Sequence, residues 1–196
     1  MNRSLPPLLA IGAYSGTGKT TLLKQLIPML RQRQVRVGLI KHTHHDMDVD
    51  TPGKDSYELR KAGADQTLVA SDRRWALMTE TPEQQPLDLR YLAGRFEADK
   101  VDLILVEGFK HEPVSKILLY RAEIGRPLED MLDQFVVAVA SDQPLSIAAK
   151  QLGSQSTGKH RRLYCRVVER RSVAALFCVL RIAKSPERQF RAFGLV

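Results

Sequence analysis

Cysteine is scarce in this sequence: among 196 residues, only Cys165 and Cys178 carry a thiol. Two cysteines are too few for a disulfide framework, and they cannot by themselves complete a four-ligand zinc site. Proteins that keep so few thiols and no disulfide framework are typical of reducing compartments. The cysteine content therefore favours a reducing, cytoplasmic setting.

Long hydrophobic runs are missing as well. The longest candidate, VDLILVEGF (residues 101–109), contains two acids and is much shorter than a membrane span. The start of the chain, MNRSLPPLLAIG, leads straight into a glycine-containing loop and has neither the longer apolar region nor the cleavage site of a signal peptide. We therefore expect no membrane segment and no signal peptide. With 43% hydrophobic and 27% charged residues, the composition is that of an ordinary globular domain.

Acidic residues are nearly absent from the end of the chain. Residues 146–196 hold eleven lysines and arginines but only Glu169 and Glu187, a net charge of +9, whereas residues 1–145 are close to neutral. We therefore expect a domain over residues 1–145 and a basic C-terminal tail over residues 146–196. Three interpretations of the tail stay open: an arm that binds a partner or anionic ligand, a nucleic-acid-binding arm, or an end altered by frameshift or fusion.

Apolar segments alternate with segments of helical spacing along residues 1–145. Continuous apolar runs of five to eight residues, interrupted by amphipathic helices, indicate a parallel sheet covered by helices on both faces. The predicted fold class is α/β, a three-layer arrangement like that of P-loop NTPases. The predicted sheet strands are residues 8–13, 35–41, 101–108, 115–121 and 134–141. A predicted helix begins at Lys19, a short one runs from Lys54 to Gly63, and another covers residues 86–96. Residues 66–80 are predicted to form two short strands around a turn.

The stretch AYSGTGKTTLL (residues 13–23) lies between the first predicted strand and the first predicted helix. The P-loop pattern G-x-x-x-x-G-K-[ST] is met at its end, but alanine stands at position 13, and the nearest glycine lies one place earlier. Glycines let backbone N–H groups turn toward an anion, and a helix N-terminus adds positive charge. We expect Lys19 to reach the β- and γ-phosphates, Thr20 to bind Mg²⁺ and Thr21 to bond the α-phosphate. The predicted nucleotide-binding residues are Gly16, Thr17, Gly18, Lys19, Thr20 and Thr21.

A carboxylate follows the most apolar strand, in VDLILVEGFK, where Glu107 comes after four apolar residues. Ligands of open parallel sheets collect beyond the carboxyl ends of the strands, so Glu107 is expected to face the phosphate loop as a catalytic or metal-binding group. A solvated charge at the end of the strand is the alternative. Asp102 precedes the same strand and is expected at the opposite edge.

A run of histidines and aspartates, KHTHHDMDVDTPGKDS (residues 41–56), follows the second predicted strand. If it is extended, alternate residues share a face, and these are His42, His44, Asp46, Asp48 and Asp50. We expect Asp48 or a neighbouring aspartate to join the nucleotide–Mg²⁺ shell as a catalytic and metal-binding group. A zinc site and a solvated polar loop are the alternatives. Lys41 and Lys54 add positive charge for phosphates or an anionic partner.

The residues do not specify the nucleobase. Guanine-selective GTPases commonly carry an N/T-K-x-D segment after a late strand, and the nearest match, DKVD (residues 99–102), has the wrong first residue and precedes its strand. ATP and GTP are both compatible with these residues.

Four segments together resemble the MobB family of molybdopterin-guanine dinucleotide biosynthesis adaptor proteins. They are GTGKTTLL, GLIKHTHHDMDVDTPGKDSYELRKAGADQ, RWALMTE and DLILVEGFKHE, and the resemblance runs from about residue 8 to residue 143. It implies a homodimeric, cytoplasmic GTP-binding protein of molybdenum cofactor biosynthesis. By position, Gly16 to Thr20 would hold phosphates, and Asp48 and Glu107 would lie at the nucleotide–metal centre. The basic tail departs from the family pattern.

The resemblance also implies partners. One is a MobA-type guanylyltransferase, which joins a GMP unit to molybdopterin, and the other is molybdopterin or its guanine dinucleotide. The expected activity is at most a slow Mg²⁺-dependent GTPase, because the sequence shows no obvious arginine finger near the phosphate loop.

Two other functional classes stay open. A small-molecule kinase could use YRAEIGRP (residues 120–127) as a lid carrying Arg121 and Arg126, although no acceptor-binding signature is present. A nucleic-acid-binding NTPase is supported by the basic tail alone, which is weak support for nucleic acid as a partner.

Overall fold

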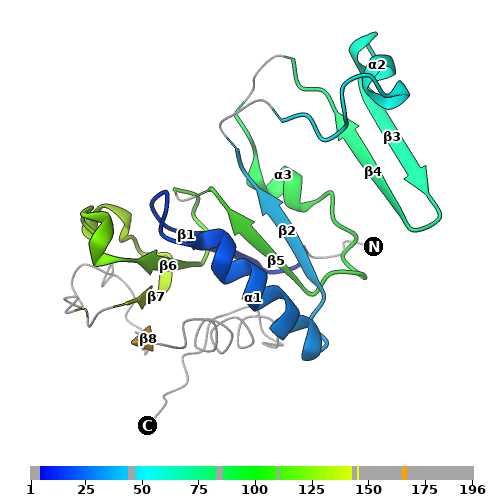
Figure 1. The fold of residues 1–196 in the computed structure, drawn as a ribbon. Helices are drawn as coiled ribbons and strands as arrows, with labels where there is room; N and C mark the ends of the chain where they lie inside the picture. The colour runs from blue at the N-terminus through cyan, green and yellow to red at the C-terminus, as the bar shows by residue number, and fades with distance from the viewer. Residues whose placement is uncertain are drawn as a thin grey trace. The chain divides into compact units, whose positions relative to one another are not determined.

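The computed structural model of the chain describes residues 5–43, 47–82, 86–109, 111–142 and 145, and the backbone of residues 165 and 166 (Figure 1). The chain separates into two compact units. The first, here called the sheet unit, comprises residues 1–42 and 89–196. The second, here called the hairpin unit, comprises residues 43–88. In sequence, the hairpin unit is therefore an insertion into the sheet unit.

The sheet unit is built on a parallel sheet with the strand order β2-β5-β1-β6-β7-β8 (Figure 1). Its strands are β1 (Leu8–Gly12), β2 (Val37–Lys41), β5 (Leu103–Glu107), β6 (Lys116–Tyr120), β7 (Val136–Ser141) and β8 (Cys165–Arg166). Because the strands are parallel, their carboxyl ends meet at one edge, where ligands of such sheets bind. The five strands predicted from the sequence are confirmed.

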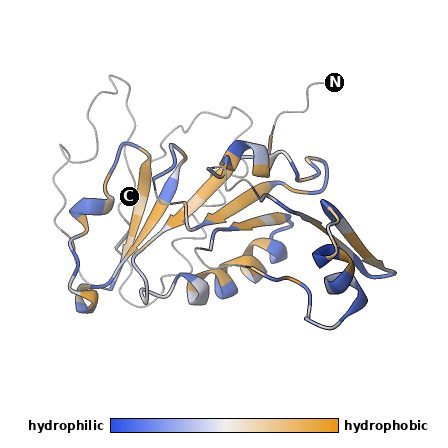
Figure 2. Ribbon diagram, turned by 90° about the horizontal axis from the view of Figure 1, so that it is seen from above, coloured by the Kyte–Doolittle hydropathy of each residue, from blue (hydrophilic) through white to orange (hydrophobic). Residues whose placement is uncertain are grey.

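Helices cover both faces of this sheet. Helix α1 (Lys19–Gln32) packs its buried leucines, including Leu26 and Leu30, against Leu9 and Ile11 of β1. Helix α3 (Leu89–Ala93) packs against the neighbouring residue Ala10, whose side chain points to the opposite face. The strands are therefore hydrophobic on both faces, as Figure 2 shows by their orange colour. The three-layer α/β fold class is confirmed.

The connection between β6 and β7 contains two short 3-10 helices, η1 (Ala122–Ile124) and η2 (Glu129–Met131). We call residues 121–132 the β6–β7 loop. Leu128 and Met131 of this loop are buried against Leu118 of β6 and Val139 of β7. The loop therefore has its own apolar anchor on the sheet.

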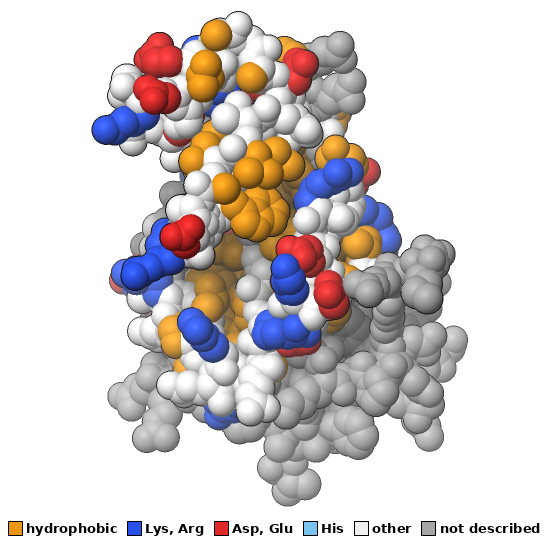
Figure 3. All heavy atoms as spheres, turned by 90° about the vertical axis from the view of Figure 1, so that its right-hand side faces the viewer, with side chains coloured by type: hydrophobic (Ala, Val, Ile, Leu, Met, Phe, Trp, Pro, Cys, Tyr) orange, Lys and Arg blue, Asp and Glu red, His pale blue; other side chains and the backbone are white. Residues whose placement is uncertain are grey.

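The hairpin unit consists of helix α2 (Asp55–Lys61) and the antiparallel strands β3 (Gln66–Ser71) and β4 (Arg74–Thr79). The register pairs Leu68 with Leu77 and Ala70 with Trp75, so these four side chains share one face of the hairpin. Leu68 is 58% exposed and Trp75 is 60% exposed. Figure 3 shows exposed hydrophobic side chains among charged ones. The predicted pair of strands around a turn is confirmed.

Most of the basic tail lies outside the described residues. Two of its residues form β8, which pairs in parallel with Ala140 and Ser141 of β7. The three interpretations of the tail stay hypotheses. Within the described ranges, none of the helices combines the length and apolar character needed to cross a bilayer.

Candidate functional site

The glycine loop connects β1 to α1 at the carboxyl edge of the sheet. Gly16 and Gly18 have φ values of 79° and 98°, a left-handed conformation that a side chain would strain. Gly18 is also the N-cap of α1, and its carbonyl accepts the N–H of Leu22 at 3.0 Å. The two glycines thus provide the sharp turn and the helix start that the sequence predicts for a phosphate loop.

Lys19 lies folded over this loop. Its ammonium Nζ donates to the carbonyl oxygens of Ala13 and Tyr14, both at 3.1 Å. Neutral carbonyls are weaker partners for a cation than phosphate oxygens are, since charge-assisted bonds are about twice as strong. The ammonium is therefore already at the loop and can exchange these carbonyls for an anionic ligand.

The three threonines of the loop have different environments. The hydroxyl of Thr17 donates to the carbonyl of Tyr14 at 2.9 Å and Thr17 is only 2% exposed, so this side chain braces the loop. Thr20 and Thr21 lie in the first turn of α1 and are exposed. Their hydroxyls are accessible to a metal or a phosphate, as the sequence predicts.

Glu107 is the last residue of β5, beside Ile11 of β1 and Lys41 of β2. It is 9% exposed, and its carbonyl accepts the N–H of His42 at 2.8 Å. Because Ile11 precedes the phosphate loop by two residues, Glu107 lies at the edge of the sheet where that loop begins. This agrees with the position expected from the sequence.

Gly108 determines the direction of the backbone directly after Glu107. Its φ is 100°, and a Cβ at this position would lie 2.8 Å from Cβ of His42 and 3.0 Å from the carbonyl oxygen of His42. The rings of His42 and Phe109 have centroids 5.0 Å apart, so the ends of β2 and β5 stay in contact beyond the strands. Only glycine allows this close approach, which sets the direction of the backbone at Glu107.

Asp48 belongs to the hairpin unit, where it contacts Arg60 of α2. The Nη2 atom of Arg60 lies 2.6 Å from Oδ1 of Asp48 and 2.8 Å from Oδ1 of Asp50, and Nη1 lies 3.1 Å from Oε1 of Glu80. The hydrogen bonds from Arg60 hold the pKa of Asp50 below its ordinary value. We call these four residues the Arg60 cluster. Its guanidinium ties the aspartate segment to α2 and to the residue after β4.

The predicted site residues belong to both units. The phosphate-loop residues and Glu107 share one edge of the sheet unit, while Asp48 lies in the hairpin unit, and its metal-binding role stays a prediction. His44 and Asp46, on which the zinc alternative depends, lie outside the described residues. Among the residues that are described, no group of three or more histidines, cysteines and acids is arranged to hold a metal ion.

Arg121 lies beside the phosphate loop, a neighbour that the sequence does not predict. A Cβ built on Gly18 would lie 3.8 Å from Nη2 of Arg121, the first residue of the β6–β7 loop. One feature of the sequence could have indicated this position: Arg121 is the last residue of a predicted strand, so it lies at the edge of the sheet where ligands bind. The sequence does not show that β6 lies directly beside β1, and this neighbour relation brings Arg121 to the loop.

A parallel α/β sheet with a left-handed glycine loop, a lysine and a threonine between its central strand and the following helix defines a P-loop protein. Residues 8–142 match the family MobB, described as molybdopterin guanine dinucleotide synthesis protein B. The chain belongs to the MobB family of molybdopterin-guanine dinucleotide biosynthesis adapter proteins.

Two relatives support this assignment. The chain is 66% identical over 146 residues to the molybdopterin-guanine dinucleotide biosynthesis adapter protein of Escherichia coli (strain K12). This match covers 74% of this chain and 83% of the relative. It is 54% identical over 147 residues to the protein of the same description from Haemophilus influenzae (strain ATCC 51907 / DSM 11121 / KW20 / Rd). This match covers 75% of this chain and 80% of the relative. The crystal structure of Bacillus subtilis MobB superposes with a TM-score of 0.62 at 24% identity, covering 89% of this chain and 96% of that one, and supports the fold.

Proposed function

We propose that this protein binds GTP and Mg²⁺ through its phosphate loop and assists the attachment of GMP to molybdopterin, which forms molybdopterin guanine dinucleotide. The observation that carries the nucleotide proposal is the loop itself, with two left-handed glycines and the Lys19 ammonium folded over it. Family membership supports the pathway and the choice of GTP over ATP. At most, the protein is a slow GTPase.

The residues present fit a nucleotide with its metal. Backbone N–H groups of the loop and of the first turn of α1 bind phosphate oxygens, and Lys19 neutralises their charge. The exposed hydroxyl of Thr20 and the carboxylate of Glu107 are oxygen ligands of the kind that Mg²⁺ prefers. When bound, the metal reduces the charge on the β- and γ-phosphates. We propose Asp48 as a further metal-associated carboxylate.

The base assignment is tested by titration calorimetry with GTP and with ATP in the presence of Mg²⁺. We expect GTP to bind at least about tenfold more tightly, a difference of about 1.4 kcal/mol. Equal affinities would contradict GTP as the nucleotide. The adapter role is tested by mixing the protein with a MobA-type guanylyltransferase and molybdopterin, because an adapter should raise the yield of the dinucleotide.

Replacing Glu107 with glutamine, or Asp48 with asparagine, is expected to weaken the Mg²⁺-dependent part of GTP binding and hydrolysis about tenfold, since each removes a charged ligand. Binding of GTP without metal should stay close to that of the unchanged protein. Affinities measured with Mg²⁺ and with EDTA separate the two effects. Equal losses under both conditions would show that these carboxylates do not act through the metal.

Each of these variants has a matched control. Glu97→Gln removes an exposed carboxylate from the sheet unit and should leave both affinities unchanged. Asp50→Asn removes the other aspartate that bonds Arg60, and because Asp50 makes two hydrogen bonds to Arg60 where Asp48 makes one, it disturbs the Arg60 cluster at least as much. If Asp50→Asn reproduces the effect of Asp48→Asn, the effect comes from the cluster and not from a metal contact.

We also propose that the protein is a homodimer and that the hairpin contributes its interface. A two-stranded hairpin is at best marginally stable by itself, and the apolar face of Leu68, Ala70, Trp75 and Leu77 is exposed. A second copy of the same face would cover it with side chains of matching character. Family resemblance implies the same state.

A further inference from the structure

The β6–β7 loop lies against the phosphate loop at two points. A Cβ built on Gly18 would lie 3.8 Å from Nη2 of Arg121, and one built on Gly16 would lie 3.8 Å from Cδ1 of Ile124. Arg121 directly follows Tyr120, the last residue of β6, so it starts from the carboxyl edge of the sheet. One guanidinium and one apolar side chain therefore border the glycines of the loop.

The guanidinium of Arg121 is held in place by one hydrogen bond, but another of its N–H donors has no partner within the described part of the chain. Its Nη1 donates to Oε1 of Glu123 at 2.7 Å. Its Nε is shielded from solvent and has no hydrogen-bond partner within the described part of the chain. A shielded donor without a partner costs free energy, which an anionic ligand would recover. The planar guanidinium can offer Nε and Nη2 together to a phosphate while Nη1 keeps Glu123.

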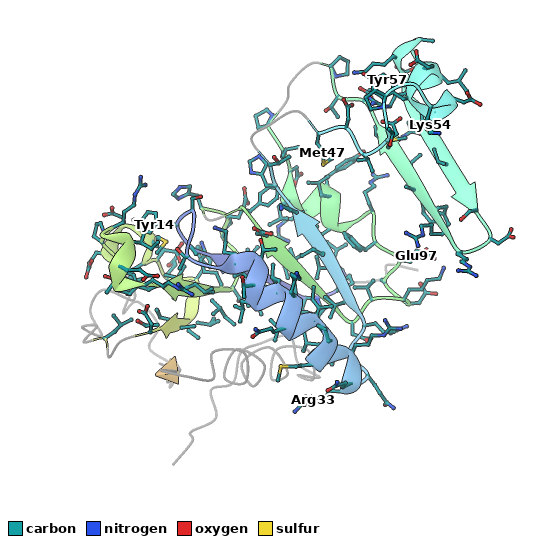
Figure 4. All side chains as sticks on the ribbon, viewed as in Figure 1. Tyr14, Arg33, Met47, Lys54, Tyr57 and Glu97 are labelled. Atoms are coloured by element: carbon teal, nitrogen blue, oxygen red, sulfur yellow. The ribbon has the colours of Figure 1, made fainter. Side chains whose placement is uncertain are left out.

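The β6–β7 loop is also tied to the phosphate loop through Tyr14. The Tyr14 hydroxyl donates to the carbonyl of Pro127 at 2.9 Å, and the guanidinium carbon of Arg126 lies 5.3 Å from the centre of the Tyr14 ring. Figure 4 shows Tyr14 next to this loop. Burial and the neighbouring Asp130 raise the pKa of Tyr14, so its hydroxyl stays protonated and can donate at neutral pH. Arg121 therefore belongs to a segment anchored at the phosphate loop.

Arg121 and Glu107 flank the phosphate loop from opposite sides. Glu107 ends β5 and Arg121 follows β6, and these two strands pair with β1 on its two sides. If Glu107 holds the metal, its side of the phosphate loop would face the γ-phosphate end of the nucleotide. The side of Arg121 then corresponds to the nucleoside end of the phosphate chain.

We propose that Arg121 is a binding residue for the α- and β-phosphates of the nucleotide, positioned by Glu123 and by the Tyr14 anchor. The inference rests on the proposed nucleotide binding. It assigns Arg121 to affinity for diphosphates and triphosphates alike, and not to charge that develops at the γ-phosphate. An arginine in this position leaves hydrolysis slow, although it lies beside the loop.

The test compares the affinities of GDP and GTP in Arg121→Ala with those in the unchanged protein. Both affinities are expected to fall by about 10- to 100-fold, because both nucleotides carry the α- and β-phosphates that lose a charged donor. The single-turnover rate of bound GTP should change by less than about threefold. Arg95→Ala is the matched control, since it removes the same charge from an exposed position of the sheet unit and should leave both affinities unchanged.

Two results would overturn the proposal. One is an unchanged GDP affinity in an Arg121→Ala protein whose circular dichroism and melting temperature match the parent. The other is a loss confined to the turnover rate, which would place Arg121 at the γ-phosphate. If Arg121→Ala does not fold, Arg121→Gln keeps the stem and decides by the same measurements. If the protein without any substitution binds neither GDP nor GTP, the proposed function itself is refuted.

Discussion

Lys19→Ala is expected to abolish measurable binding of GTP·Mg²⁺, with an affinity loss of at least about 100-fold. The ammonium lies 3.1 Å from each of two loop carbonyls, so it is already inside the loop that would receive the phosphates. Removing it deletes at least two charge-assisted contacts, each worth about 1.5–3 kcal/mol, and leaves the phosphate charge uncompensated. Titration calorimetry measures the loss directly.

Lys24→Ala is the control for this substitution. Lys24 is exposed on the same helix, and its removal changes the net charge equally without touching the loop. It should keep the affinity of the parent. If Lys19→Ala also binds GTP normally, the phosphate loop is not the nucleotide site and the proposed function is wrong.

Leu77→Asp is expected to convert the proposed dimer into monomers. Leu77 is 47% exposed and pairs with Leu68 on the apolar face of the hairpin, so a second copy would bury it. An aspartate there would place a carboxylate without a partner in each half of a symmetric interface, at a cost of several kcal/mol. Sedimentation velocity across a range of concentrations should show at least about a 100-fold weaker association.

Leu59→Asp introduces the same change on a different element. Leu59 is 66% exposed on α2 and is not one of the four side chains of the apolar face, so this variant should remain dimeric. A Leu77→Asp protein that stays dimeric would exclude the hairpin face as the interface. If the protein without any substitution sediments as a monomer at all concentrations, the proposal that it is a homodimer is refuted.

The sequence predicted most of the fold because the deciding signals are local. Continuous apolar runs locate the strands, and the leucine spacing after Lys19 locates α1. The helix predicted over residues 86–96 is shorter in the structure, where α3 covers only Leu89–Ala93. Pro86 and Gly94 lie on either side of it, and both residue types are poor helix formers.

The part of the candidate site formed by a single sequence motif could be predicted from the sequence. The contacts between segments that are distant in the sequence were harder to predict. Gly16, Gly18 and Lys19 lie within four successive residues of the chain, so their arrangement follows from the motif. The contact of Arg121 with this loop depends on the order of the strands, which no local pattern contains. Asp48 or a neighbouring aspartate was expected to join a metal shell, but nothing in this segment shows that Arg60 of α2 contacts the carboxylates of both Asp48 and Asp50.

The strand order has a consequence for the growing chain on the ribosome. β1 and β2 are the first strands to be synthesised, yet they do not pair with each other, because β5 lies between them. Neither strand can pair with β5 until residues 103–107 are made, and these are synthesised only after the whole hairpin unit. During that interval the apolar faces of β1 and α1 have no sheet to cover them. The nascent chain therefore exposes its future core for longer than a fold with sequential strand pairing would, and this is the period in which a chaperone has most to protect.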